Sequence, residues 1–324
     1  MEAAHDFRNA LKDEKIKKTG HDIKYAISAL KKCDIEVGGA LFDTMLAHYL
    51  IEPEASHDLS ILCNQYLGYQ LQEDAGDELN KFCERVDQTF QLKHKLLKEL
   101  ENRRHSLLMR DVEMPLVAAL ATMETEGVRV DEDVLKKISD ALKVDIEKAQ
   151  KEVYKIAGTE FNIGSPKQLG EVLFDKMKLL DKAKKTKTGQ YATGEDILIK
   201  LAADHEIARK ILDYREFEKL RSTYVDALPK MMSKTDGRIH SDFRQAVAAT
   251  GRLSSNNPNL QNIPIRTERG RQVRGAFVPR NKDFLFMSAD YSQIELRIAA
   301  SFAKDEIMIE AFRNKRDIHT TTAA

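Results

Sequence analysis

The chain has 324 residues, of which 42% are hydrophobic, and this length allows two or three domains with ordinary hydrophobic cores. Its 52 lysines and arginines balance 52 aspartates and glutamates, so net charge gives no argument for nucleic-acid binding, and only local clusters could. No stretch approaches the roughly 20 apolar residues that cross a bilayer, and residues 1–15 lack a signal-peptide core, which predicts a cytoplasmic protein with no membrane partner.

Residues 1–110 are rich in helix-like patterns, interrupted by Gly38 and Gly39. The three cysteines, Cys33, Cys63 and Cys83, all lie here and show none of the spacings of a metal site. This fits a reducing cytoplasm, and we expect three buried thiols.

Residues 113–233 predict long amphipathic helices. Residues 113–126 form one that Gly127 ends, Asp131 caps a longer one that ends at Gly158, and residues 206–228 form its antiparallel partner. The apolar positions expected on the buried face of the first long helix are Val134, Ile138, Leu142, Ile146, Ala149, Val153 and Ile156.

Shorter elements are expected between the two long helices. Ser165-Pro166 opens a short helix, and Thr193 with Asp196 caps another. A basic tip lies between them, made of Lys182, Lys184, Lys185 and Lys187. A charge run is usually only a solvated face, but these lysines flank Gly189 on a loop that could follow phosphates.

From Gly237 the pattern changes to strands and turns. Residues 238–249 alternate like a strand, and residues 254–264, dense in Asn, Ser and Pro, favour an ordered loop over a helix. The strongest local basic excess follows, in Arg266, Arg269, Arg271, Arg274, Arg280 and Lys282. It could be a charged hairpin rim or a surface that contacts phosphates.

The chain is organised around residues 284–297. The hydrophobic run Phe284–Met287 predicts a short buried strand that ends near Asp290, at an exposed edge. Ser292 can begin a helix there. An aspartate held there suits Mg²⁺ binding. Ser292 and Glu295 also satisfy S-x-x-E, so spacing alone favours a capping box with Asp290 as a turn residue.

Three stretches resemble family A DNA polymerases, the bacterial DNA polymerase I group, in the family's order and spacing. DYSQIELR (residues 290–297) resembles the first palm motif, ATGRLSSNNPNLQNIPIR (249–266) the primer-template segment, and DIHTTTAA (317–324) the segment after the first motif. KTGHDIKYAISAL (18–30) and GALFDTMLAHYLIEP (39–53) resemble the back of the 3′–5′ exonuclease domain. The resemblance covers nearly all of this chain but only part of a polymerase.

The resemblance implies a multidomain α+β protein. A partial α/β exonuclease-like (ribonuclease H-like) domain would occupy residues 1–110 (the N-terminal segment), and an all-α thumb with long antiparallel helices residues 111–235 (the middle segment). The first part of the palm, with an antiparallel sheet, would occupy residues 236–324 (the C-terminal segment). The family's fingers and its second metal-binding aspartate would follow Ala324, and its 5′ nuclease domain is also absent.

The exonuclease-like domain departs from its family. The family's proofreading site holds two metal ions with carboxylates from three motifs. The first motif would precede Met1, and Ala26 stands where the second has its metal-facing aspartate. In the third, Lys81 and Arg85 occupy the tyrosine and ligand positions, and only Asp87 remains. We expect a degenerate scaffold without proofreading activity.

The resemblance implies a DNA-directed DNA polymerase, a nucleotidyltransferase of DNA replication and repair that acts as a monomer near the nucleoid. It would add dNTPs to a primer on template DNA with two Mg²⁺ ions. Asp290 would bridge both metals, the carbonyl of Tyr291 would supply another oxygen, and Glu295 would crowd the sugar 2′ position. His319 would reach the triphosphate, with Gln293 and Arg297 in support.

The residues that match the family's DNA contacts are Lys182, Lys184, Lys185, Lys187, Lys219, Arg221, Arg252, Asn259, Gln261, Asn262 and Arg266. Arg252 would check the shape of the primer-template minor groove. Because one carboxylate cannot clamp two metals, we expect the 324 residues alone not to extend a primer. A noncatalytic DNA-binding module and a purely structural helical scaffold remain the alternatives.

Overall fold

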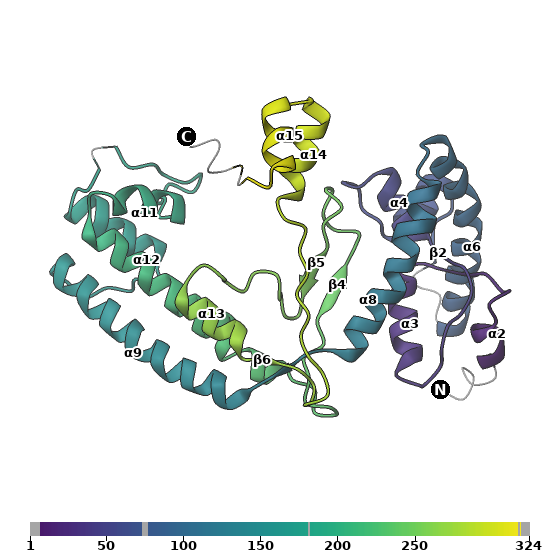
Figure 1. Cartoon of the computed structure of the whole chain (residues 1–324), viewed down its shortest axis with the longest axis horizontal. Helices are drawn as coiled ribbons and strands as arrows, with labels where there is room; N and C mark the ends of the chain where they lie inside the picture. Colours follow the sequence, from purple (N-terminus) through teal and green to yellow (C-terminus); the bar gives the residue numbers. More distant parts are fainter. Residues whose placement is uncertain (1–6, 73–76, 181, 317, 319–324) are drawn as a thin grey trace. The chain divides into compact units, whose positions relative to one another are not determined.

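The computed structural model describes residues 7–72, 77–180, 182–316 and 318, and divides into two compact units, Met1–Arg280 and Asn281–Ala324. Helices dominate both units, and the described residues form three two-stranded sheets, all in the first unit (Figure 1). This confirms the predicted α+β class. None of the helices in the described part of the chain is long and apolar enough to cross a membrane.

The N-terminal segment is built on two parallel strands, β1 (Lys18–Gly20) and β2 (Leu41–Asp43). Helix α3 (Ile23–Lys31) lies between them in sequence, because parallel strands need a crossover connection. The other elements are α2 (Arg8–Lys12), α4 (Thr44–Ile51), α5 (Leu59–Leu62), the π-helical turn η1 (Cys63–Leu67) and α6 (Glu78–Asn102). Leu46, Leu62, Leu92 and Leu96 are each at most 2% exposed and form the centre of the core.

The expectation of three buried cysteines was wrong. Cys63 is buried, but Cys33 is only partly buried and Cys83 is exposed. Cys83 lies in the first half of α6, where Phe82 and Val86 are each 66% exposed and burial begins only at Gln88. A helical residue is buried only where its face packs on a neighbour.

Two long helices of the middle segment, α9 (Glu132–Ala157) and α12 (Glu206–Lys219), run side by side (Figure 1). They are antiparallel, since Lys210 pairs with Glu152 at 2.7 Å and Ser139 donates a hydrogen bond to Asp226 at 2.7 Å. The carboxylate of Asp131 caps α9, and Gly158, at φ 62°, ends it. The predicted bounds of α9 and its pairing are confirmed.

The buried face of α9 differs from the predicted one at both ends. Leu135 and Ala157 are buried, whereas Val134 is partly exposed and Ile156 is 37% exposed. The helix packs into two core clusters: Leu135 shares one with Ile138 and Leu142, and Ala157 shares the other with Val153. The five predicted positions from Ile138 to Val153 are buried as expected.

The connecting elements of the middle segment match the predictions only in part. The hydroxyl of Ser165 accepts from the amide of Gln168 and caps α10, as predicted. Thr193 does not cap a helix, because α11 begins one residue later, after Gly194.

The remaining elements up to residue 235 have the following bounds: α7 (Ser106–Leu108), η2 (Met109–Glu113), α8 (Met114–Glu126), β3 (Arg129–Val130), α10 (Pro166–Gly170), η3 (Glu171–Lys176), α11 (Glu195–Ala202), η4 (Leu220–Val225) and η5 (Leu228–Met231).

The C-terminal segment begins in the first unit with β4 (Asp242–Arg244), which pairs antiparallel with β5 (Ser254–Asn256). The predicted strand at residues 238–249 is therefore confirmed over three residues, and the predicted loop starts as a strand. The basic run forms a helix, α13 (Glu268–Gly275), and not a hairpin rim. Strand β6 (Phe277–Val278) then pairs antiparallel with β3.

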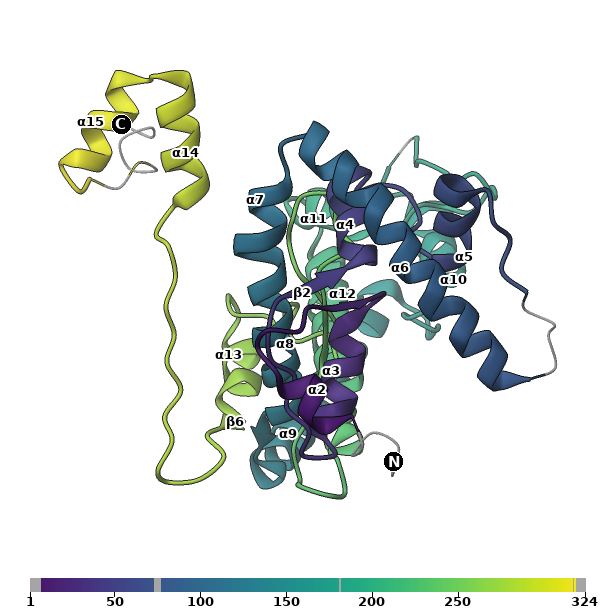
Figure 2. The same ribbon diagram turned by 90° about the vertical axis from the view of Figure 1, so that its right-hand side faces the viewer.

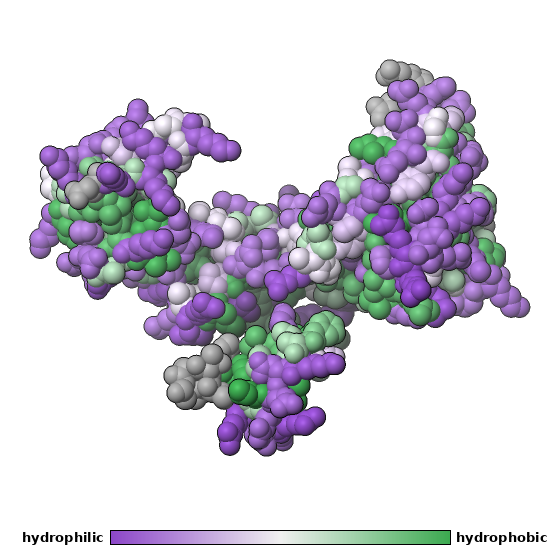
Figure 3. All heavy atoms as spheres, turned by 90° about the horizontal axis from the view of Figure 1, so that it is seen from above, coloured by the Kyte–Doolittle hydropathy of each residue, from purple (hydrophilic) through white to green (hydrophobic). Residues whose placement is uncertain are grey.

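The second unit contains α14 (Ile294–Ala303) and α15 (Glu306–Arg313), which pack together. The predicted buried strand Phe284–Met287 is wrong: this stretch is an extended run without strand pairing, and Leu285 and Met287 are 92% and 88% exposed (Figure 2). A strand needs a neighbour to pair its backbone, and the described residues of this unit supply none. Hydrophobic residues, green, also reach the surface elsewhere in the face seen in Figure 3.

The helix after this stretch begins later than predicted. Gln293 is its N-terminal cap residue, with φ 53°, and makes no side-chain capping bond to the helix. Ser292 therefore lies outside α14 and does not begin the helix as the capping-box interpretation requires. The backbone at Gln293 turns too sharply for a regular cap at Ser292.

Candidate nucleic-acid interface and metal ligand

The predicted basic tip is an exposed loop of the middle segment. Lys182, Lys184, Lys185 and Lys187 are all exposed there. The ammonium of Lys185 lies 4.9 Å from the centre of the Tyr191 ring, and the two residues form a backbone bridge. The loop lines an open cavity of about 960 Å³ together with Gly194 and Arg215. A flexible row of cations beside a cavity can follow a phosphate chain.

The two other basic residues predicted on this segment differ in their surroundings. Lys219, the last residue of α12, is exposed. The Nε of Arg221 lies 3.3 Å from a carboxylate oxygen of Asp226 and 3.3 Å from the hydroxyl of Ser139. Arg221 therefore holds η4 against α9, and in this structure its guanidinium is occupied within the protein.

The polar residues predicted to meet primer and template lie on both sides of β5: Arg252 comes before it, and the others are in the turn after it. Arg252, Gln261 and Asn262 are exposed, and Asn259 is partly buried. The side-chain oxygen of Asn259 accepts from the amide of Gln261 at 3.0 Å, and the carbonyl of Asn262 accepts from the hydroxyl of Tyr224 at 2.7 Å. These bonds fix the backbone of the turn and leave amide groups at the surface.

The basic excess around α13 is largely used within the protein. Arg269 donates two hydrogen bonds to one oxygen of Asp145, at 2.6 and 2.9 Å. Other arginines donate to backbone carbonyls: Arg274 to Ile263 at 2.9 Å and Arg271 to Arg266 at 2.7 Å. The guanidinium of Arg280 pairs with Glu126 at 2.6 Å. Of the predicted DNA contacts in this run, Arg266 itself is exposed.

The predicted metal ligand lies in the second unit. Asp290 and Tyr291 are adjacent and exposed, just before α14. Arg297 donates from Nε to the carbonyl of Ser292 at 2.9 Å, and its guanidinium lies 4.5 Å from the centre of the Phe312 ring. Arg297 thus supports the turn that carries Asp290. Glu295 lies in the first turn of α14, and His319 lies outside the described residues.

The chemistry of these residues fits Mg²⁺ as part of a site. A carboxylate of Asp290 and a backbone carbonyl of Tyr291 are the hard oxygen ligands that Mg²⁺ prefers. Across the described ranges, no group of three His, Cys, Asp or Glu residues is placed to hold a metal ion. These residues can therefore supply one carboxylate ligand, and a second must come from elsewhere.

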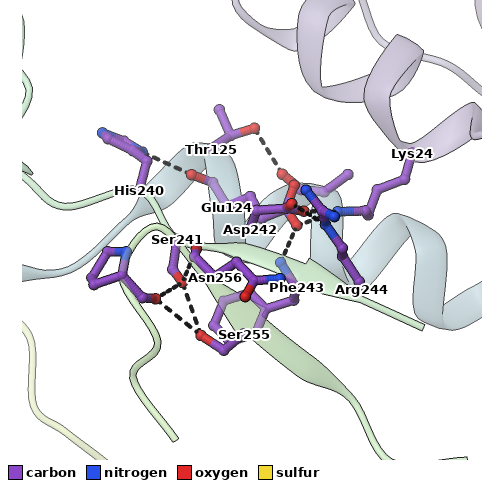
Figure 4. A network of polar contacts seen from close by, with 12 residues as sticks. Lys24, Glu124, Thr125, His240, Ser241, Asp242, Phe243, Arg244, Ser255 and Asn256 are labelled. Carbon is purple, nitrogen blue, oxygen red and sulfur yellow. Dashed lines mark hydrogen bonds and ion pairs between the residues drawn. The ribbon is translucent and has the colours of Figure 1, made fainter. Parts of the chain in front are cut away.

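Lys24, in the stretch that resembles the second exonuclease motif, joins three segments of the first unit (Figure 4). Its ammonium binds the carboxylates of Glu124 on α8 and Asp242 on β4, the latter at 3.0 Å. Burial acts to lower the pKa of Lys24, but the two carboxylates outweigh it and raise that pKa. Ala26 is exposed on α3, and Arg85 and Asp87 are exposed on α6. Through Lys24, α3 is therefore linked to α8 and β4.

Sequence reasoning missed the role of Asp43, which is 1% exposed. Its carboxylate accepts hydrogen bonds from the amides of Ile23 at 2.7 Å and Met45 at 2.8 Å, so it joins α3 to the start of α4. Burial raises its pKa to about 6, and these amides oppose the rise. An Asp-Thr pair between a hydrophobic strand and an apolar helix was the available signal for such a cap.

His21 predicts a measurable acid sensitivity. Burial lowers its pKa from 6.5 to about 4, and its ring lies 2.9 Å from the hydroxyl of Thr44. Because the folded pKa lies below the unfolded one, this contribution to stability is present above pH 6.5 and is lost as pH falls through 4. Between pH 7 and pH 4, we expect the unfolding free energy of His21→Asn to fall by about 3 kcal/mol less than that of the wild type.

Urea denaturation at pH 7 and at pH 4 measures this difference. His94→Asn is the matched control, since His94 is exposed on α6. The control should follow the wild type. If His21→Asn also follows it, His21 does not titrate as its burial implies.

The comparison with known proteins decides the family. Residues 132–324 match DNA polymerase family A. The chain belongs to this family. Residues 1–76 also match the ribonuclease H-like domain of DNA polymerase I. The predicted resemblance is therefore confirmed, and so is the predicted presence of a ribonuclease H-like domain beside part of a polymerase domain.

Relatives in this family are similar over nearly the whole chain. The chain is 44% identical to DNA polymerase I of Bacillus subtilis (strain 168), over 98% of the chain and 38% of that protein. It is also 44% identical to DNA polymerase I of Geobacillus stearothermophilus, over 97% of the chain and 37% of that protein. The chain thus spans well under half the length of these relatives.

A solved structure supports the same placement. The structure of the POL domain of Pol1 from M. smegmatis, in complex with DNA primer-template and dNTP, matches with a TM-score of 0.87 and 37% sequence identity. The match covers 98% of this chain and 55% of that chain. The fold of this chain is therefore that of part of a family A polymerase.

Proposed function

We propose that this chain is part of a DNA-directed DNA polymerase that adds dNTPs to a primer on template DNA, in replication and repair. The observation that carries this proposal is the family match over residues 132–324, together with the likeness to a structure bound to primer-template and dNTP. In this proposal residues 1–110 are the exonuclease-like domain, residues 111–235 the thumb and residues 236–324 the first part of the palm.

Two surfaces of the first unit would hold the primer-template duplex. The exposed lysines at residues 182–187 would contact phosphates, which gives affinity without sequence preference. The exposed Arg252, Gln261 and Asn262 would lie against the minor groove, where acceptors occur at similar places in every base pair. This arrangement lets a polymerase bind any sequence.

The second unit would provide the reaction's carboxylate. Mg²⁺, when bound, neutralises phosphate charge and stabilises the attacking and leaving oxygens. Asp290 and the carbonyl of Tyr291 would hold it, and Arg297 keeps their turn in place through the carbonyl of Ser292. Glu295 would restrict the sugar 2′ position, while Gln293 and His319 would lie on the nucleotide side.

Proofreading is expected to be absent. Ala26 offers no ligand, and an arginine at position 85 cannot coordinate a cation. Lys24, from the same motif as Ala26, is engaged by Glu124 and Asp242. Removal of a mismatched 3′ nucleotide by the purified chain with Mg²⁺ would contradict this part of the proposal.

The 324-residue chain alone is expected to bind a primer-template duplex without extending the primer, as a DNA-binding module would. A single predicted metal carboxylate, with no three-ligand group among the residues described, favours this second role for the isolated chain. Efficient incorporation of dNTPs by these 324 residues would overturn it. No DNA affinity at all would instead favour a structural scaffold.

The basic tip predicts a change in salt dependence. The double substitution Lys184→Gln, Lys185→Gln should weaken duplex binding and lower the slope of log affinity against log salt by roughly 0.9 for each phosphate that the protein no longer neutralises. Fluorescence anisotropy with a labelled duplex, over a salt series, measures the slope. Lys148→Gln, Lys151→Gln removes the same charge from exposed positions of α9 and should leave the slope unchanged. Equal slopes for both double variants would place the DNA away from the tip.

A further inference from the structure

Tyr49 connects the N-terminal segment to the loop that leads into the predicted primer contacts. Its side chain is 3% exposed, and its hydroxyl donates to the carbonyl of Ala248 at 2.7 Å. A buried tyrosine hydroxyl requires a partner. Here the partner comes from a part of the chain 199 residues away, not from the tyrosine's own segment.

The contact falls on a single tight turn. The amide of Gly251 donates to the same Ala248 carbonyl at 3.1 Å, which closes the turn 248–251. Gly251 has φ +80°, a conformation that glycine adopts readily. Burial raises the pKa of Tyr49, and the amide of Gly251 opposes the rise, so this amide also faces the hydroxyl. Arg252 directly follows this turn, so the conformation of the turn sets the direction of the backbone at Arg252.

The residues just before the turn are also held by other parts of the first unit. Gln245 is 6% exposed and donates to the carboxylate of Glu113 at 2.6 Å and to its carbonyl at 3.2 Å. Ala246 packs against the hydrophobic core of the N-terminal segment. Val247, between Ala246 and the turn, is 55% exposed. The loop is thus held to the protein at Gln245 and Ala246 and exposed to solvent at Val247.

Tyr49 itself is held in place. It belongs to α4, whose start is capped by the buried carboxylate of Asp43. The ring of His57 meets it edge-on, with 5.7 Å between ring centres. A rigid donor of this kind restricts the conformations of the loop before DNA arrives, and a restricted loop loses less entropy on binding.

We propose that Tyr49 is a positioning residue for primer-template binding, and that the N-terminal segment, without proofreading ligands, supports the loop that presents Arg252. This inference rests on the proposed function, since it requires Arg252 and its neighbours to meet DNA. It assigns a task to the exonuclease-like domain that needs no metal.

The test is Tyr49→Phe in the complete polymerase, which removes one oxygen and keeps the ring. We expect the KM for primer-template to rise about 5- to 10-fold with kcat little changed, because loop order affects binding before chemistry. Amide hydrogen exchange at residues 248–252 should become at least about 10-fold faster, since the turn opens more often.

Tyr66→Phe is the matched control, because Tyr66 packs edge-on against His48 within the N-terminal segment. It should leave both KM and exchange at residues 248–252 unchanged. An unchanged KM in Tyr49→Phe overturns the inference, and so does an equal rise in Tyr66→Phe, which would indicate general loosening. A wild-type protein that does not bind primer-template overturns the proposed function and this role with it. The exchange comparison still decides whether Tyr49 holds the turn.

Discussion

Asp290→Ala in the complete polymerase is expected to lower the rate of primer extension by at least about 10³-fold, because in the proposed function Asp290 holds a metal ion that would contribute several kcal/mol to the transition state. The affinity for primer-template should remain within about 2-fold of the wild type, since phosphate and groove contacts from other residues give that affinity. Single-turnover extension and equilibrium binding measure the two effects separately.

Asp283→Ala is the control for this experiment. Asp283 is an exposed aspartate of the second unit, in the turn just before the extended stretch, and its loss changes the net charge equally. Extension by this variant should match the wild type. If Asp290→Ala loses binding and extension in the same proportion, Asp290 acts on DNA binding and not as a metal ligand.

Lys24→Met is expected to destabilise the first unit by about 3 kcal/mol, because removing one partner of a buried ion pair leaves uncompensated charge. The side chain of Lys24 is 12% exposed, that of Glu124 14% and that of Asp242 35%, so water screens the two carboxylates only in part. Methionine retains the length of the lysine chain, which limits the loss of packing. Urea denaturation of the 324-residue chain measures the free energy of unfolding.

A lysine on the same side of the unit provides the comparison. Lys32 directly follows α3 and is exposed, so Lys32→Met should change the unfolding free energy by less than about 0.5 kcal/mol. Adding Glu124→Gln to Lys24→Met should recover part of the loss, because it removes the carboxylate charge that Lys24 no longer neutralises, whereas Asp242 still pairs with Arg244. A loss below about 0.5 kcal/mol for Lys24→Met would show that the bridge does not stabilise the unit.

The stretch that resembles the second exonuclease motif contains a residue with a structural role, Lys24. The motif keeps Lys24 and lacks the aspartate expected at position 26. The cation that remains is bound by carboxylates from α8 and β4, which lie 100 and 218 positions further along the chain. No local pattern around Lys24 predicts partners at such distances.

The sequence by itself determined the family and both ends of α9, and it named the candidate ligands. Matches to the family's motifs identified the family. Local chemistry predicted both ends of α9: an aspartate oxygen accepts hydrogen bonds from free amides at its start, and Gly158 supplies the left-handed backbone at its end. Such interactions join residues within a few positions of each other. These local interactions can therefore be predicted from the sequence without knowledge of the fold.

Tertiary structure alone decided what each charged or apolar residue contacts. Phe284–Met287 has the composition of a buried strand but no neighbour to pair with among the described residues, and it is exposed. Arg221 resembles a DNA contact by position and Arg269 belongs to the basic run, yet each binds an aspartate of the first unit. Tyr49 reads as an ordinary helical residue until Ala248 lies against its hydroxyl. Burial and pairing depend on residues far apart in sequence, and only the folded chain brings these together.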